Sequence, residues 1–488
     1  MRKTKIVCTL GPASTKEEII HAMLKAGMNV ARVNFSHGDH ASHGKTIDLF
    51  RGVRDAMGLS AAVMLDTKGP EIRVTGMSSE FAQGIPVATG DRLLLKGTDQ
   101  DAVSSRECIY LNYAMVCRDV PVGAVVLIDD GEIELHVLEK KNEALVCEVC
   151  NGGVICARKS VNIPGVAIDL PSVTERDARF IDWAIENDID FVAHSFVRKK
   201  EDVLAVKEII KRRNSSIKII SKIENREGVD NIDKILDETY GIMVARGDLG
   251  VEIPAEEIPV VQRFLVNKCI ESKKPVIIAT QMLHTMITHP RPTRAEISDV
   301  ANAIYQRVDA VMLSGETANG QYPVEAVETM ARVAREIERD TAQHSPDTDM
   351  NLVRINNEIT AQLARSAVRA CLNLPIHAII IDTLSGRTGR YLAAFRGSKP
   401  VYAVCYRKCV MRQLAISYGI HAIYQEPTVD HESFLLGVLY YLEDRKWLKK
   451  EDLVVVIGGS FGAAKGASFL EIGSLLNLEH KALNSKKE

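Results

Sequence analysis

The chain has 488 residues, 46% of them hydrophobic, and its 61 lysines and arginines against 64 aspartates and glutamates leave a net charge of −3. This length predicts two to four domains, and the nearly balanced charge argues against a surface for nucleic acid. No apolar run approaches the ~18 residues of a membrane span, and the run after the basic start is too short for a signal peptide, so we expect a cytoplasmic protein.

Eight short apolar runs rich in β-forming residues predict the strands of one sheet. They are Lys5–Leu10, Asn29–Val33, Ala61–Leu65, Asp190–Ser195, Ile217–Ser221, Gly241–Ala245, Pro275–Ala279 and Asp309–Leu313. Helical patterns separate most of them, for example over 200–213, 259–274 and 294–308, and capping boxes at Ser14–Glu17 and Thr174–Asp177 predict helix starts. Repeated strand–helix units imply a parallel sheet, and eight of them imply a closed (β/α)₈ TIM barrel.

Two further regions interrupt or follow this repeat. Residues 70–168 contain short alternating runs and no clear helical pattern, which predicts an all-β lid domain inserted after the third strand. A polar stretch over 343–349 resembles a linker, and strands near 378–381, 401–405 and 453–457 predict a small open α/β domain. We therefore expect a barrel over 1–69 and 169–343, a lid over 70–168 and a C-terminal domain over 344–488.

Polar and charged residues follow six of the eight predicted strands. Because catalytic groups of such barrels gather at the C-terminal ends of the strands, these residues predict one functional rim. The rim residues are Arg32, Asn34, Ser36, Asp66, Thr67, Lys68, Arg73, Lys222, Glu224, Arg246, Gly247, Asp248, Thr280, Gln281, Ser314 and Glu316.

The rim residues fall into sets that suit an anionic substrate. Arg32, Arg73 and Lys222 supply positive charge, and Glu224 and Asp248 supply the oxygen ligands that Mg²⁺ prefers. The oxygens of a further set, Asn34, Ser36, Asp66 and Thr67, suit a monovalent cation. The turn at 246–250 is expected to open a short helix whose N–H groups could bind an anion. Together these features favour phosphoryl transfer.

Several of these features also have a purely structural explanation. A single lysine or aspartate at a strand end is more often a salt-bridge partner than a catalyst. We interpret His37, His40 and His43 as loop residues rather than metal ligands. Cys147 and Cys150 form a C-x-x-C pair, but the sequence offers no second ligand pair, which argues against zinc.

Long motifs in the first 340 residues resemble those of the pyruvate kinase family. The segment IKIISKIENREGV at 217–229 is similar to the family signature, and KIVCTLGPAS, NVARVNFSHG, LDTKGPEIR, VARGDLGVEIP, ATQML, HPRPTRAEISDVANA and AVMLSGETANG occur in the family's order. The resemblance implies a homotetramer that transfers a phosphoryl group between phosphoenolpyruvate and ADP/ATP with Mg²⁺ (or Mn²⁺) and K⁺.

The resemblance also implies a role for individual residues. Lys222 would stabilise the transferred phosphoryl group, Arg32 would contact the substrate phosphate, and Glu224 and Asp248 would hold the divalent ion. The three-carbon acid would lie on Gly247, Asp248 and Thr280, and K⁺ on Asn34, Ser36, Asp66 and Thr67. The nucleotide would contact Asn34, Phe35, Ser36, His37, Arg73 and Lys159. Thr280, Ser314 and Glu316 are the alternatives for orienting the water that protonates the enolate.

Two predictions concern potassium and regulation. Glu71 lies at the hinge of the insertion, where the resemblance implies that glutamate accompanies a potassium requirement; the alternative is a hinge salt bridge. Thr383, Ser385, Gly386, Arg387 and Thr388 follow a predicted strand and precede a helix expected to start near Gly389. They could cradle a phosphate, and the resemblance implies that of a sugar-phosphate effector, with a glycine-rich loop at 458–466, including Lys465, closing over it. The alternative is an ordinary helix cap at Ser385 or Thr388.

Two other functions are compatible with part of the rim. A Mg²⁺-dependent lyase or aldolase acting on pyruvate enolate would share Glu224, Asp248 and an arginine, but would need neither Lys222 nor a nucleotide lid. A non-catalytic binder of phosphorylated metabolites would not need Lys222, Glu224 and Asp248 together.

Overall fold

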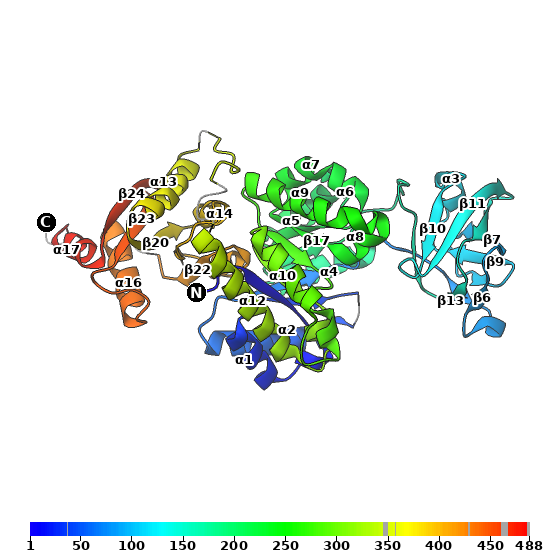
Figure 1. Ribbon diagram of the computed structural model, residues 1–488, viewed down its shortest axis with the longest axis horizontal. Helices are drawn as coiled ribbons and strands as arrows, with labels where there is room; N and C mark the ends of the chain where they lie inside the picture. The colour runs from blue at the N-terminus through cyan, green and yellow to red at the C-terminus, as the bar shows by residue number, and fades with distance from the viewer. Residues whose placement is uncertain (37, 345–349, 357, 428–429, 460–466, 486–488) are drawn as a thin grey trace.

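The computed structural model describes residues 1–36, 38–344, 350–356, 358–427, 430–459 and 467–485. Three bodies lie in a row, with the barrel in the middle, the inserted domain at one end and the C-terminal domain at the other (Figure 1). None of the described helices is long and apolar enough to span a membrane.

The central body is the predicted closed parallel barrel. Its strands, in chain order, are β1 (Lys5–Leu10), β2 (Val30–Asn34), β3 (Ala62–Asp66), β15 (Phe191–His194), β16 (Lys218–Ile223), β17 (Gly241–Ala245), β18 (Val276–Ala279) and β19 (Ala310–Leu313). The barrel closes because β1 pairs with both β19 and β2. All eight strands were predicted, with ends that differ by at most two residues.

Alternating side chains fill the barrel and attach its helices. Val7, Met64 and Phe191 belong to the interior cluster, whereas Ile6 and Cys8 belong to the core outside the strands. The outer helices are α1 (Glu17–Ala26), α2 (His40–Ala56), α4 (Glu175–Glu186), α5 (Lys200–Arg212), α7 (Ile232–Glu238), α9 (Ile258–Glu271), α10 (Arg294–Tyr305) and α12 (Pro323–His344).

One of the two predicted capping boxes is present. The Thr174 side chain accepts a hydrogen bond from the Asp177 N–H at the start of α4, as predicted. The box at Ser14–Glu17 was wrong, because α1 has Lys16 as its N-cap. Ser14 Oγ instead accepts from Gly11 N (3.0 Å) around a 3₁₀ turn.

The inserted body is a β domain with its own core. Its main sheet has the order β4-β14-β10-β11-β12-β7-β9. The strands are β4 (Ile72–Arg73), β7 (Arg92–Gly97), β9 (Cys108–Leu111), β10 (Val125–Ile128), β11 (Ile133–Lys141), β12 (Ala144–Val149) and β14 (Ser160–Asn162). One helical turn that the sequence pattern did not predict, α3 (Val116–Asp119), buries Val116 against the sheet.

The C-terminal body is the predicted open α/β domain. The sheet order is β22-β21-β20-β23-β24, with β20 (Ile376–Thr383), β21 (Val401–Cys405), β22 (Ile420–Tyr424), β23 (Leu453–Gly459) and β24 (Ala467–Ser474). Its helices include α13 (Ile359–Asn373), α14 (Arg387–Ala394), α16 (His431–Asp444) and α17 (Leu475–Ser485). Two arginines of this domain pair with barrel carboxylates, Arg396 with Asp309 and Arg412 with Asp190.

Candidate active site

The ammonium group of Lys222, near the C-terminal end of β16, lies among three oxygens from three strands or their ends. Its Nζ is 2.8 Å from Ser195 Oγ, 2.9 Å from Glu224 Oε1 and 3.2 Å from Asp66 Oδ1. Burial alone would lower the pKa of Lys222, but the carboxylates of Asp66 and Glu224 outweigh it and raise that pKa above its usual value. Lys222 is therefore a fixed positive charge at the barrel mouth.

Asp66 joins Lys222 to Arg32. Arg32 Nε lies 2.7 Å from Asp66 Oδ2, and its Nη1 donates to Thr9 Oγ1 at 2.8 Å. Asp66 is 1% exposed, and burial would raise its pKa, but Arg32 and Lys222 together lower it. Asp66 thus bridges two cations, Arg32 and Lys222, which are groups that can bind an anionic ligand.

Glu224 and Asp248 come from adjacent strands, because β16 pairs with β17. Glu224 is 0% exposed and its Oε2 accepts a hydrogen bond from Phe196 N at 2.6 Å. Burial raises the pKa of Glu224; Lys222 opposes this shift, whereas the charge of Asp248 adds to it. Asp248 is exposed in the short helix α8 (Arg246–Glu252). Two repelling carboxylates, one of them fully buried, are a donor set that a divalent cation would stabilise.

The four residues predicted for a monovalent ion meet at one corner of the rim. Asn34 is the register partner of Asp66, and Asn34 Oδ1 accepts from Ser36 N at 3.1 Å. Thr67 is buried, and its Oγ1 accepts from Ser195 N at 3.2 Å. The backbone therefore brings these four residues to the same corner, and amide, hydroxyl and carboxylate oxygens are ligands that suit a hard cation.

The ring of Phe35, a residue predicted to contact the nucleotide, lies in the core. It is 0% exposed and packs edge-on against Phe180, with ring centroids 4.8 Å apart. His40 and His43 lie in the first turns of α2 rather than in a loop, and their rings pack on Phe35. This aromatic cluster supports the end of β2, so the Phe35 ring stabilises the core beside the predicted nucleotide contacts. His37 lies outside the described residues.

Thr280 follows β18 and has a strained backbone. Its φ is +67°, which is unfavourable for a β-branched residue and is typical of functional sites. Its hydroxyl donates to Ala279 O (2.7 Å) and accepts from Gly247 N (2.8 Å). The predicted short helix begins at Arg246, but the Gly247 N–H already has this partner.

Ser314 and Glu316 differ in how free their side chains are. Glu316 is 2% exposed and accepts from Ser314 N (2.7 Å) and Leu283 N (3.1 Å), so it ties together the loops after β18 and β19. Ser314 Oγ is buried and has no hydrogen-bond partner among the described residues. The structure therefore favours Thr280 or Ser314 over Glu316 as a group that orients a proton-carrying water.

A cavity of 620 Å³ opens between the barrel rim and the inserted domain. Its wall includes Arg73 and Lys159 from the inserted domain and Asp248 from the barrel. Lys159 Nζ lies 2.8 Å from Asp129, and Arg73 is paired with Glu71. Glu71 also lies 3.4 Å from Lys68, so the hinge salt bridge that was the alternative for Glu71 is present.

Sequence reasoning missed two polar residues of the site. Ser195 contacts Lys222, Asp66 and Thr67, and Thr9 contacts Arg32. Both lie at the C-terminal ends of predicted strands, the first and the fourth, which are the two strands from which no rim residues were taken. The rule that identified the other residues would have found these two as well.

Some residues of the predicted phosphate-binding loop in the C-terminal domain are exposed to solvent and others are buried. Ser385 and Arg387 are exposed, whereas Thr383 and Thr388 are 6% and 5% exposed. Thr383 Oγ1 accepts from Gly386 N at 2.9 Å, and Gly386 has a φ of +76° that suits glycine. The helix begins at Arg387 rather than near Gly389, and neither Ser385 nor Thr388 caps it. Residues 460–466, with Lys465, lie outside the described residues.

Comparisons with known proteins match nearly the whole chain to one family. Family models described as the barrel domain and the alpha/beta domain of pyruvate kinase match residues 1–327 and 361–472. Curated pyruvate kinases of Geobacillus stearothermophilus and Bacillus licheniformis are 45% and 42% identical, over 94% and 97% of this chain and 78% and 80% of their own length. A third, from Borreliella burgdorferi, is 41% identical over 97% of both chains.

A solved structure extends the match to three dimensions. The crystal structure of a pyruvate kinase from Cryptosporidium parvum has a TM-score of 0.91 and 37% identity, covering 97% of this chain and 96% of the other. Shared fold and sequence over nearly the whole length favour the kinase over the aldolase and binder alternatives. The chain belongs to the pyruvate kinase family.

Proposed function

We propose that Lys222, Arg32, Glu224 and Asp248 form the machinery with which this phosphotransferase moves the phosphoryl group of phosphoenolpyruvate to ADP. The observation that carries the proposal is the position of the Lys222 ammonium, 2.9 Å from the buried Glu224 and 3.2 Å from Asp66. Phosphoryl transfer requires a cation held in place beside carboxylates that can bind a divalent metal ion.

The reaction breaks the bond between phosphorus and the enol oxygen and forms a bond to a terminal oxygen of ADP. Arg32 binds the substrate phosphate, and Lys222 offsets the charge that develops on the transferred group. Glu224 and Asp248 would hold a divalent cation, Mg²⁺ or Mn²⁺, which supplies further charge neutralisation. The enolate then takes a proton on carbon to give pyruvate, with Thr280 or Ser314 orienting the water that delivers it.

Four residues are proposed to bind K⁺, namely Asn34, Ser36, Asp66 and Thr67. Support comes from the pairing of β2 with β3, which brings Asn34 beside Asp66. Lys68 and Arg73 pair with Glu71 at the hinge, whereas the carboxylate of Asp66 is paired with Arg32 and Lys222. Potassium would therefore bind there chiefly through the uncharged oxygens of Asn34, Ser36 and Thr67.

The cavity is proposed as the ADP site. Arg73 and Lys159 offer positive charge to the phosphates from the inserted domain, which would close over the nucleotide as a lid. Asn34 and Ser36 remain proposed contacts from the barrel side. Gly247 and Asp248, in the first turn of α8, would hold the three-carbon acid.

Oligomerisation and regulation complete the proposal. Val260 and Phe264 on α9 are 60% and 42% exposed, and such apolar side chains fit a subunit interface of a homotetramer. A sugar phosphate would contact the exposed Ser385 and Arg387, whereas the buried Thr383 and Thr388 shape the loop.

Binding of Mn²⁺, followed by electron paramagnetic resonance, tests the metal ligands apart from turnover. Glu224→Gln and Asp248→Asn should each weaken Mn²⁺ binding by at least about tenfold. Asp233→Asn is the matched control, because Asp233 pairs with Lys268 on the outside of the barrel. Affinities equal to the wild type in both site variants would contradict the assignment.

A further inference from the structure

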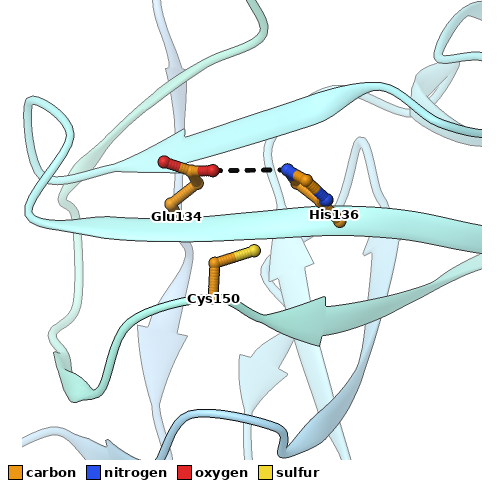
Figure 2. A group of neighbouring side chains, drawn as sticks. All are labelled: Glu134, His136 and Cys150. Atoms are coloured by element: carbon orange, nitrogen blue, oxygen red, sulfur yellow. Dashed lines mark ion pairs between the residues drawn. The ribbon is translucent and has the colours of Figure 1, made fainter.

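Three side chains with nitrogen, oxygen and sulfur donors gather on the lid domain, away from the cavity. Glu134 and His136 lie two positions apart on β11, and Cys150 follows the end of β12 (Figure 2). One ligand atom of each residue lies within 4.8 Å of the other two. Glu134 Oε1 and His136 Nε2 are 3.3 Å apart.

The β ladder fixes the three positions. Residues 134 and 136 share a face of β11, because Ile133, Leu135 and Val137 turn to the other face and into the lid core. Cys150 N donates to Glu134 O at 2.8 Å, which keeps the chain beside Glu134 after β12 ends. Glu134 N in turn donates to Asn151 Oδ1 at 2.6 Å.

The cluster differs from the cysteine pair in the sequence. Cys147 is 0% exposed and belongs to the lid core, whereas Cys150 is half-buried on the outer side. The two thiols therefore lie on opposite faces of the sheet and cannot share an ion. Partners for Cys150 come from the neighbouring strand instead, which a search for local spacing does not detect.

Glu148 adds a second carboxylate close to the cluster. It is the register partner of His136 across β11 and β12 and is exposed. Burial and the charges of Glu134 and Glu148 raise the pKa of the Cys150 thiol. A thiol in this setting is protonated and unreactive until a cation compensates the surrounding negative charge.

We propose that Glu134, His136 and Cys150 form a binding site for a divalent transition ion of the Zn²⁺ class on the outer face of the lid. Mixed sulfur, imidazole and carboxylate donors suit such an ion and are a poor set for Mg²⁺ or K⁺, so the site is distinct from the catalytic metal positions. Tetrahedral coordination holds ligand atoms about 3.5 Å apart, so small side-chain rotations suffice.

Cobalt spectroscopy of the full-length enzyme, with Mg²⁺ in excess to occupy oxygen sites, tests the proposal. Bound Co²⁺ should give a saturable near-ultraviolet charge-transfer band from a thiolate ligand, and added Zn²⁺ should abolish it. Cys150→Ser should remove the band, and His136→Ala should weaken Co²⁺ binding by at least about tenfold. Cys156→Ser is the matched control, because Cys156 is another half-buried lid cysteine outside the cluster.

Each outcome supports or overturns the site. The proposed site would be overturned if the wild type gave no charge-transfer band or if the band survived in Cys150→Ser. It would also be overturned if His136→Ala bound Co²⁺ with wild-type affinity. Far-ultraviolet circular dichroism and the melting temperature establish that every variant is folded, so a lost band reports on the ligand and not on unfolding.

Discussion

Replacing Lys222 by alanine removes the charge on which the proposed chemistry depends. The ammonium is within 3.2 Å of three oxygens, and the strand holds it in place without substrate. Loss of one preorganised group aimed at developing charge costs about 3–4 kcal/mol, which corresponds to about 100- to 1,000-fold in turnover. Lys222→Ala should therefore lower kcat by about that factor.

The same change has a structural consequence that must be separated from catalysis. Asp66 keeps its pairing with Arg32 at 2.7 Å, but the buried Glu224 loses its cation. Leaving a buried charge without its partner costs about 3–5 kcal/mol of stability. The melting temperature should fall, and saturating Mg²⁺ should recover part of the loss, because the ion would stabilise Glu224.

Steady-state measurement of pyruvate release, with substrate and metal saturating, gives the kcat of the folded variant. Lys218→Ala serves as the control because Lys218 begins the same strand at the opposite end of the barrel. A folded Lys222→Ala enzyme with more than about a tenth of wild-type kcat would refute the role of the ammonium.

Three further changes test other parts of the account. Arg396→Ala removes a buried arginine whose Nη1 lies 2.9 Å from Asp309. The free energy of unfolding, measured in urea, should fall by about 3–5 kcal/mol because the buried carboxylate loses its partner. Arg387→Ala is the control and should have little effect, because Arg387 is exposed. Burial lowers the pKa of His194 to about 4 in the folded protein, whereas in the unfolded chain this pKa is about 6.5. As the pH falls below 6.5, the unfolded chain therefore takes up a proton at His194 before the folded protein does, and the free energy of unfolding decreases. His194→Gln should reduce this acid destabilisation, by up to ~3 kcal/mol at pH 4. Arg198 donates to the carbonyl oxygens of residues 168 and 170 at 2.6 and 2.8 Å, so Arg198→Ala should loosen the lid connection and lower kcat/KM for ADP about tenfold.

Each of these outcomes can fail in a specific way. Equal stability of Arg396→Ala and the wild type would mean that the ion pair does not join the domains. Parallel stability curves for His194→Gln and the wild type between pH 7 and pH 4 would mean that His194 is accessible to protons in the folded state. An unchanged kcat/KM for ADP in Arg198→Ala, or an equal loss in the outward-facing Lys200→Ala, would exclude a specific role in the lid.

The barrel could be predicted because the sequence patterns that indicate it, apolar runs and helical spacing, each lie within a short stretch of the chain. Buried parallel strands are continuous apolar runs, and helical spacing between them leaves few alternatives. The C-terminal strands β22 and β24 were missed for the opposite reason. Few of their residues are buried, namely Ile420 and Ile423 in β22 and Ala467 in β24, so neither strand has a clear apolar run, and β24 is an antiparallel edge strand.

The site was predictable in its residues but not in its pairings. Strand ends identified Lys222 and Glu224, yet nothing local indicated that Ser195 would contact the ammonium. Phe35 lies between predicted site residues, and only the packing of α4 shows that its ring is in the core. Contacts between strands far apart in the sequence depend on barrel closure and register, which no local pattern encodes.

The central claim is tested most directly by pyruvate formation from phosphoenolpyruvate with and without ADP, with the divalent ion and K⁺ present. The account predicts ADP-dependent pyruvate release, matched by an equal amount of ATP, and its loss in Lys222→Ala. Pyruvate release at the same rate without ADP, or no release in its presence, would contradict it.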